Sequence, residues 1–71
     1  MTPFFARIRV HDLHNAGMLD AVLRELPDLC DSFTCYPKEG LIIVQGRFAG
    51  DLQDDLNFRH INTEHIVIKD I

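Results

Sequence analysis

The sequence has 71 residues, of which 46% are hydrophobic and 25% are charged, and its formal net charge is -4 at pH 7. This length predicts a single domain over residues 1–71 with a thin core, which argues against a deep catalytic cleft. The acidic balance argues against a general binder of phosphate backbones, so nucleic acid is not an expected partner. No segment resembles a signal peptide or a membrane span, and we expect a cytoplasmic protein that does not bind membranes.

The first half of the chain predicts a strand followed closely by a helix. Residues 4–10 alternate between apolar and mixed positions, as in a strand with one buried face. Asn15 can cap the helix that follows, and Pro27 ends it because the residue before a proline is pushed out of helical geometry. The expected apolar stripe of the helix consists of Ala16, Leu19, Val22, Leu23 and Leu26.

The second half predicts a hairpin, a short helix and a last strand. Residues 31–36 and 41–48 flank the turn 37–40, in which Pro37 fixes its φ angle and Gly40 can adopt a positive φ. A short helix beginning at Asp51 would place Ala49, Leu52 and Leu56 on one side, and residues 61–71 supply the last strand. Cys30 and Cys35 would point to opposite faces of a strand, so we expect two reduced thiols in a reducing compartment.

These elements predict an α+β protein with a ferredoxin-like βαββαβ sandwich, in which two helices cover one face of an antiparallel four-stranded sheet. The other sheet face stays open. Following the alternation of each strand outward places ten residues there, with Arg47 standing beside Arg7 and Arg9. The ten are Phe5, Arg7, Arg9, Tyr36, Ile43, Gln45, Arg47, His65, Val67 and Lys69.

An open sheet face that combines Arg and Tyr with apolar side chains is typical of a protein interface. The sequence therefore predicts a small non-catalytic regulator or inhibitor that binds an acidic surface of a partner protein and forms a homodimer. In size and charge it resembles phage-encoded inhibitors of host complexes. It contains no glycine-rich phosphate loop, and neither an enzymatic activity nor a cofactor is expected. The predicted partner-binding residues are Phe5, Arg7, Arg9, Tyr36, Ile43, Arg47, His65 and Lys69.

The segment between the first strand and the first helix offers a different reading. Asp12-Leu13-His14-Asn15-Ala16-Gly17-Met18-Leu19 resembles the corresponding turn of ACT domains, with Gly17 and Leu19 carrying the match. The resemblance implies an amino-acid-sensing module, in which His14, Asn15 and Gly17 would lie at the ligand. The sequence departs from that family at Ala16, where the family usually has proline.

Two further alternatives are a metal site and a single-stranded RNA site. The predicted topology resembles heavy-metal-associated domains, but His11-Asp12-Leu13-His14 stands where that family has Cys-x-x-Cys. His11, His14 and His60 would supply imidazoles suited to Zn, Ni or Cu. Phe5 and Tyr36 beside arginines are also residue types that bind single-stranded RNA in RRM-like modules.

Overall fold

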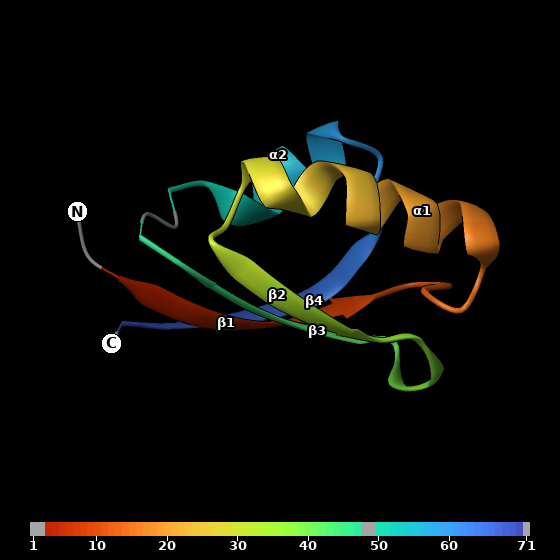
Figure 1. Ribbon diagram of the computed structural model, residues 1–71, viewed down its shortest axis with the longest axis horizontal. Coiled ribbons are helices and arrows are strands. Elements are labelled where there is room, and N and C mark those ends of the chain that lie inside the picture. Colours follow the sequence, from red (N-terminus) through yellow and green to blue (C-terminus); the bar gives the residue numbers. More distant parts are fainter. Residues whose placement is uncertain (1–2, 48–49, 71) are drawn as a thin grey trace.

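The computed structural model describes residues 3–47 and 50–70, and it shows two helices on one face of a four-stranded sheet (Figure 1). The opposite sheet face is open. This arrangement confirms the predicted α+β class and the antiparallel sheet. The elements in chain order are β1 (Phe4–Val10), α1 (Ala16–Glu25), β2 (Ser32–Tyr36), β3 (Leu41–Gly46), α2 (Leu52–Phe58) and β4 (Thr63–Asp70).

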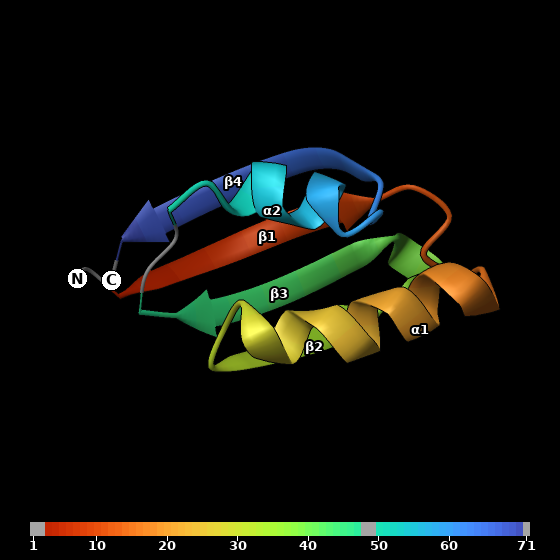
Figure 2. The ribbon, with the colours of Figure 1, turned by 90° about the horizontal axis from the view of Figure 1, so that it is seen from above.

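The strands lie in the order β2-β3-β1-β4, and every neighbouring pair is antiparallel. β1 is central, since Arg7 pairs with Ile43 of β3 on one side and with Val67 of β4 on the other. The register with β4 shifts once, between Arg9 and Val10. Seen from the helical side, α1 lies over β2 and α2 lies over β4 and β1 (Figure 2). β2 and β4 are therefore the two edges of the sheet.

The core lies between the sheet and the helices. The predicted alternation of β1 is confirmed, because every second side chain from Phe4 to Val10 is buried and the residues between them are exposed. Burial of these apolar side chains is the main favourable term in folding. The buried set consists of Phe4, Ala6, Ile8, Val10, Leu13, Val22, Leu26, Ile42, Val44, Leu52, Leu56 and Ile61.

The start of α1 is confirmed, but its predicted apolar stripe is wrong at two positions, because Ala16 and Leu23 are both exposed. The Asn15 side chain accepts hydrogen bonds from the backbone N–H groups of Gly17 and Met18, as a helix cap does. Val22 and Leu26 are buried, whereas Leu23 is 49% exposed. One residue step turns a helix by about 100°, so the side chain after Val22 points away from the sheet.

The predicted end of α1 is also confirmed, because the helix stops at Glu25 and Pro27 lies in a 3₁₀ turn, Leu26–Asp28.

At the end of α2, the Arg59 Nη1 lies 3.6 Å from the Glu25 Oε2 and 3.6 Å from the Asp28 Oδ2. These ion pairs connect the two helical segments above the sheet.

The predicted hairpin is present between β2 and β3, with a 3₁₀ turn at Pro37–Glu39. Gly40 has φ 63°, and its carbonyl accepts the backbone N–H of Val10 at 2.9 Å. A Cβ at this position would be 3.3 Å from the Val10 carbonyl oxygen. Glycine is therefore favoured both by the left-handed backbone and by the close neighbour.

Gly46 illustrates a second close approach. It pairs with Phe4 across the β1–β3 ladder, and a Cβ added to it would lie 2.7 Å from the Phe4 Cε1. The absent side chain leaves the space that the Phe4 ring occupies in the core.

The remaining elements agree with the prediction within the described residues, except that the last strand begins at Thr63 and not at Ile61. α2 buries Leu52 and Leu56, while Ala49 lies outside the described residues, as do the predicted strand ends at Phe48 and Ile71.

Cys30 and Cys35 are free thiols. They do not point to opposite faces, because Cys30 precedes β2 and both side chains pack against the core. No helix within residues 3–47 and 50–70 has the length and apolar character needed to cross a membrane.

Candidate functional site

The open sheet face is formed by three rows of side chains that run across the four strands. The strand registers align each row from β2 through β3 and β1 to β4. Residues directly opposite one another in an antiparallel pair point to the same face. The rows are Tyr36-Leu41-Arg9-His65, Thr34-Ile43-Arg7-Val67 and Ser32-Gln45-Phe5-Lys69, and these residues are called the open face below.

The open face carries Arg7, Arg9 and Lys69 but no Asp or Glu, although the chain has 11 acidic residues. None of these three cations forms an ion pair with the side chains that the structure describes. The Arg9 Nη1 donates a hydrogen bond to the Glu39 carbonyl oxygen at 3.1 Å, which leaves its charge unneutralised. The face is therefore positive on a molecule whose net charge is negative.

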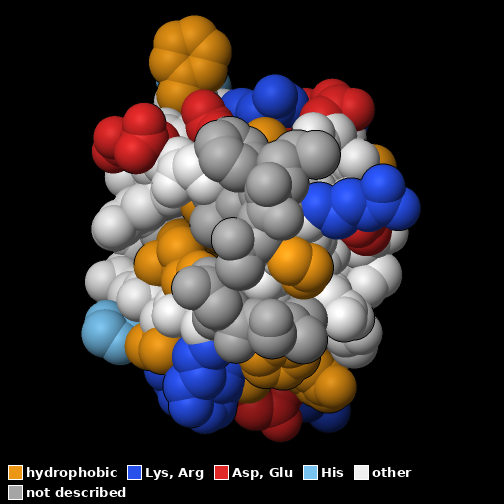
Figure 3. Space-filling view, turned by 90° about the vertical axis from the view of Figure 1, so that its left-hand side faces the viewer, with side chains coloured by type: hydrophobic (Ala, Val, Ile, Leu, Met, Phe, Trp, Pro, Cys, Tyr) orange, Lys and Arg blue, Asp and Glu red, His pale blue; other side chains and the backbone are white. Residues whose placement is uncertain are grey.

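A shallow groove of about 310 Å³ runs between these cations. It is lined by Arg7, Arg9, Leu41, His65, Val67 and Lys69, so apolar side chains lie between basic ones. Phe5 and Val67 are each 39% exposed and Tyr36 is 44% exposed, which adds aromatic and aliphatic surface. Seen from the end of the molecule, basic and hydrophobic side chains lie next to one another along the lower margin, on the side away from the helices, with acidic atoms also visible among them (Figure 3).

The structure brings together nine of the ten residues expected on this face, and Arg47 is the exception. Arg47 follows the last residue of β3, and its Nε lies 3.4 Å from the Asp31 Oδ2. The prediction that it stands beside Arg7 and Arg9 is wrong, because those residues pair with Ile43 and Leu41, several positions earlier in β3. Leu41 was not among the residues expected on the open face. The alternation of β3 could have placed it there, because Leu41 lies two residues before Ile43 and side chains two apart on a strand point to the same face.

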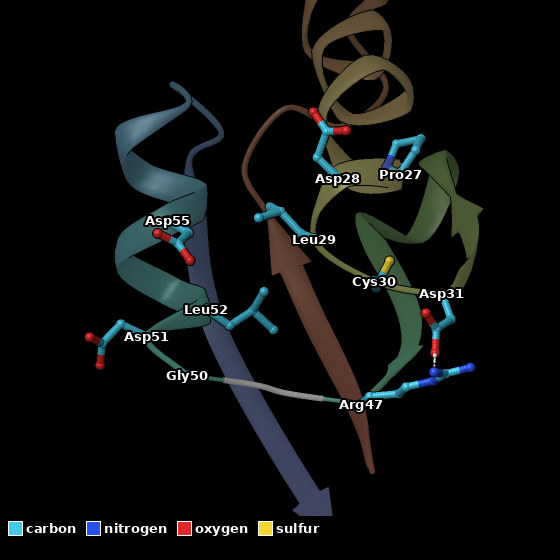
Figure 4. A pocket seen from close by; sticks show the side chains of 10 residues that line it. All are labelled: Pro27, Asp28, Leu29, Cys30, Asp31, Arg47, Gly50, Asp51, Leu52 and Asp55. Carbon is cyan, nitrogen blue, oxygen red and sulfur yellow. Dashed lines mark ion pairs between the residues drawn. The ribbon is translucent and has the colours of Figure 1, made fainter. Parts of the chain in front are cut away.

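Arg47 instead lines a hollow of about 600 Å³ near the ends of the helical segments (Figure 4). In this view Asp31 points toward Arg47, while Leu29 and Leu52 approach from opposite sides. The carboxylates of Asp28, Asp31, Asp51 and Asp55 make the lining acidic.

Cys30 also lines this hollow, and its Sγ donates a hydrogen bond to the Leu26 carbonyl oxygen at 3.3 Å. Burial raises the pKa of the Cys30 thiol, and the nearby Asp31 charge acts in the same direction. Because the thiolate is the nucleophilic form, these surroundings disfavour cysteine reactivity.

The histidines proposed as metal ligands do not converge. The His11 Nδ1 lies 2.8 Å from the Glu64 Oε1, and its Nε2 lies 3.3 Å from the Asp12 Oδ2. The hydrogen bond to Glu64, followed by the Asp12 charge, raises the pKa of His11. Within residues 3–47 and 50–70, no three His, Cys, Asp or Glu side chains are placed to hold a metal ion. The geometry gives no support to a site formed by His11, His14 and His60.

The turn that resembles an ACT domain has its first helical amides occupied. The Asn15 Oδ1 accepts the N–H of Gly17 at 2.9 Å and that of Met18 at 3.4 Å. A Cβ at position 17 would lie 3.2 Å from the same oxygen, so close packing of the cap is a sufficient reason for glycine there. A ligand carboxylate would have to compete with Asn15 for these N–H groups.

No protein-family model matches the chain, and no curated protein or solved structure resembles it significantly. The similarities to ACT and heavy-metal-associated domains therefore stay predictions, and the function is argued from the geometry of the open face.

Proposed function

We propose that this protein is a ferredoxin-like binding protein whose open face recognises an acidic surface of a partner protein. The strand order supports the fold assignment, since from the other edge it is β4-β1-β3-β2. The two strands of the β1-α1-β2 unit lie on either side of β3, and the two strands of the β3-α2-β4 unit lie on either side of β1. Each unit is therefore a split βαβ unit.

The observation that carries the proposal is the absence of any carboxylate among the open-face positions, which hold three cations without ion-pair partners among the described side chains. Arg7 and Arg9 lie two residues apart on β1 and project on the same side, so their charges repel each other. A partner that presents Asp or Glu side chains relieves this repulsion through charge-assisted hydrogen bonds.

The apolar side chains of the face supply the second component of an interface. Leu41 and Ile43 of β3 lie on one side of the β1 arginines and Val67 of β4 lies on the other, while Tyr36 lies beside Leu41. Aromatic and arginine side chains are enriched among residues that dominate binding energy. Through such contacts a small domain regulates or inhibits its partner by covering the acidic surface that other molecules would use.

The test is affinity capture from a cell lysate with three forms of the protein, followed by identification of the retained proteins. The forms are the wild type, the double variant Arg7→Glu with Arg9→Glu, and the control Arg24→Glu on the exposed side of α1. We expect a partner with an acidic surface to be retained by the wild type and the control and to be lost from the double variant. Its affinity should also fall as salt is raised, because salt screens charge attraction.

Identical capture by the double variant and the wild type would contradict the proposal, provided that the variant keeps the wild-type thermal unfolding midpoint. Retention of nucleic acid in place of an acidic protein would contradict it as well.

A further inference from the structure

β4 leaves one side of its backbone without a partner. It is the longest strand, Thr63–Asp70, and it lies at the edge of the sheet. Beyond its pairing with β1, none of its backbone groups bonds to another described segment. The opposite edge strand, β2, has five residues and is followed directly by Pro37. Natural sheets protect their edges with short strands, prolines, bulges or charged side chains. β4 is long and contains no proline, and its one register shift lies at its first residues, so the stretch from His65 to Lys69 pairs regularly with β1 and keeps its outer side open.

Apolar side chains flank this free edge on both sheet faces. Val67 lies on the open face, and Ile66 and Ile68 lie on the helical face opposite Ile8 and Ala6. Ile68 remains 38% exposed, because α2 covers β4 incompletely. Ile66 and Ile68 line a groove of about 250 Å³ alongside the start of α2.

The charges on the two sides of the edge have opposite signs. On the open face, His65 and Lys69 flank Val67, and Arg7 is the next residue inward across the sheet. On the helical side, the groove is bordered by Asp51 and Asp54. A segment lying along this edge would therefore meet cations on one face and carboxylates on the other.

We propose that the edge of β4 binds an extended segment of the partner as a fifth strand, in which acidic and apolar residues alternate. The acidic side chains point to the open face, beside His65 and Lys69, and the apolar side chains enter the groove beside Ile66 and Ile68. Successive side chains of a strand point to opposite faces, which matches this division. Strand addition supplies the backbone hydrogen bonds, and the alternation supplies the selectivity. This inference rests on the proposed function and specifies how the partner is recognised.

A second copy of this chain fits the edge poorly. A two-fold axis that pairs β4 with β4 antiparallel keeps both open faces on the same side of the extended sheet. Such a pairing joins the Arg7, Arg9 and Lys69 cations of both copies into one continuous surface whose positions hold no carboxylate, and like charges gathered in this way repel one another. The charge pattern therefore favours a different, acidic chain.

The test is titration of the ¹⁵N-labelled protein with capped eight-residue peptides, followed by NMR. The first peptide alternates Glu and Val, and the second has the same composition with all Glu residues before all Val residues. We expect the alternating peptide to shift the amide signals of β4 more than those of β2. The block peptide should bind about tenfold more weakly or worse, a difference near 1.4 kcal/mol.

Backbone participation is tested with two N-methylated forms of the alternating peptide, one methylated at the Glu amides and one at the Val amides. An added strand directs alternate N–H groups toward its neighbour, so one form should lose binding and the other should keep it. Lys69→Glu should weaken binding about tenfold, whereas Arg24→Glu should leave it unchanged.

Equal binding of both N-methylated peptides, or of the alternating and block peptides, would overturn strand addition. The proposed function would survive that result if Arg7→Glu with Arg9→Glu still lost the captured partner. Failure of every acidic peptide to shift β4 would likewise overturn the inference. Tighter binding of an eight-nucleotide polyuridylate than of the alternating peptide would overturn both proposals.

Discussion

The open face and the acidic hollow near the helix ends differ in how their cations are neutralised. Arg47 lines the hollow and lies 3.4 Å from the Asp31 carboxylate, and Arg59, at the far end of α2, lies 3.6 Å from Asp28, which also lines the hollow. On the open face, Arg7 and Lys69 have no such partner among the described side chains. The paired arginines connect segments of the fold, whereas the unpaired cations are available to another molecule. Arg24 and Lys38 also have no ion pair among the described side chains, so what distinguishes the open face is that its unpaired cations gather on a surface without carboxylates.

The largest effect is expected where the helical layer meets the sheet. Leu26→Ala removes a fully buried side chain and should lower the free energy of unfolding by about 2 to 5 kcal/mol. Leu23→Ala, three residues earlier, should lower it by about 1 kcal/mol or less, because Leu23 is half exposed. Urea denaturation of the two variants measures the contrast, and equal losses would show that the phase of α1 is wrong.

A smaller loss is expected from adding one methyl group on the buried side of β3. Gly46→Ala forces the Phe4 ring to move and should cost about 1 to 3 kcal/mol of unfolding free energy. Gln45→Ala, the preceding residue on the open face, should change stability by about 0.5 kcal/mol or less. If thermal denaturation finds Gly46→Ala as stable as the parent, the Phe4 ring has space that the structure does not show.

Removing a paired arginine should cost more stability than removing an unpaired one. Arg59→Ala breaks the contacts with Glu25 and Asp28, and we expect a loss of about 1 kcal/mol at low salt that shrinks as salt increases. Arg7→Ala should leave the stability nearly unchanged. Chemical denaturation at two salt concentrations tests both variants. A larger loss of stability for Arg7→Ala than for Arg59→Ala would contradict the view that the ion-paired arginine stabilises the fold and the unpaired one does not.

The smallest effect concerns the exposed His11, whose pKa should lie above 6.5 in the folded protein because of Glu64 and Asp12. Glu64→Gln should move the pKa back toward 6.5, as measured by NMR titration of the ring signals. A raised pKa in the folded state means that protonation favours folding. The associated stabilisation is complete below about pH 6.5 and disappears as the pH rises through the pKa of the folded protein. An unchanged pKa in Glu64→Gln would show that the hydrogen bond does not form in solution.

Much of the fold could be predicted because local physical rules decided it. Asn15 is a capping residue before an apolar helical pattern, Pro27 ends a helix, and Gly40 permits a left-handed turn. Leu23 could not be placed by the same rules. Helical spacing places Leu23 at the margin of a wide apolar stripe. Whether a side chain at that margin is buried depends on how much of the helix the sheet covers, and the sequence does not show this.

The candidate site was predictable along the strands and unpredictable at their ends. Alternation alone placed Arg7, Arg9 and Lys69 on one face, and this placement agrees with the strand registers. Extending the alternation of β3 to Arg47 failed because the strand ends at Gly46. The free edge of β4 could not be predicted, because alternation shows which face a side chain lies on but not the order of the strands in the sheet.

The central position of β1 has a consequence for how the chain folds. β1 is the first strand in the sequence, yet its partners are β3 and β4. Its partner nearest in sequence is Leu41, which pairs with Arg9, and every other β1 pair closes a longer loop. Loop closure costs entropy before the ladder forms, so we expect slower folding than for a helical bundle of equal size. During synthesis, β1 has no neighbour on either side until the residues of β3 have emerged, and its pairing stays incomplete until β4 follows.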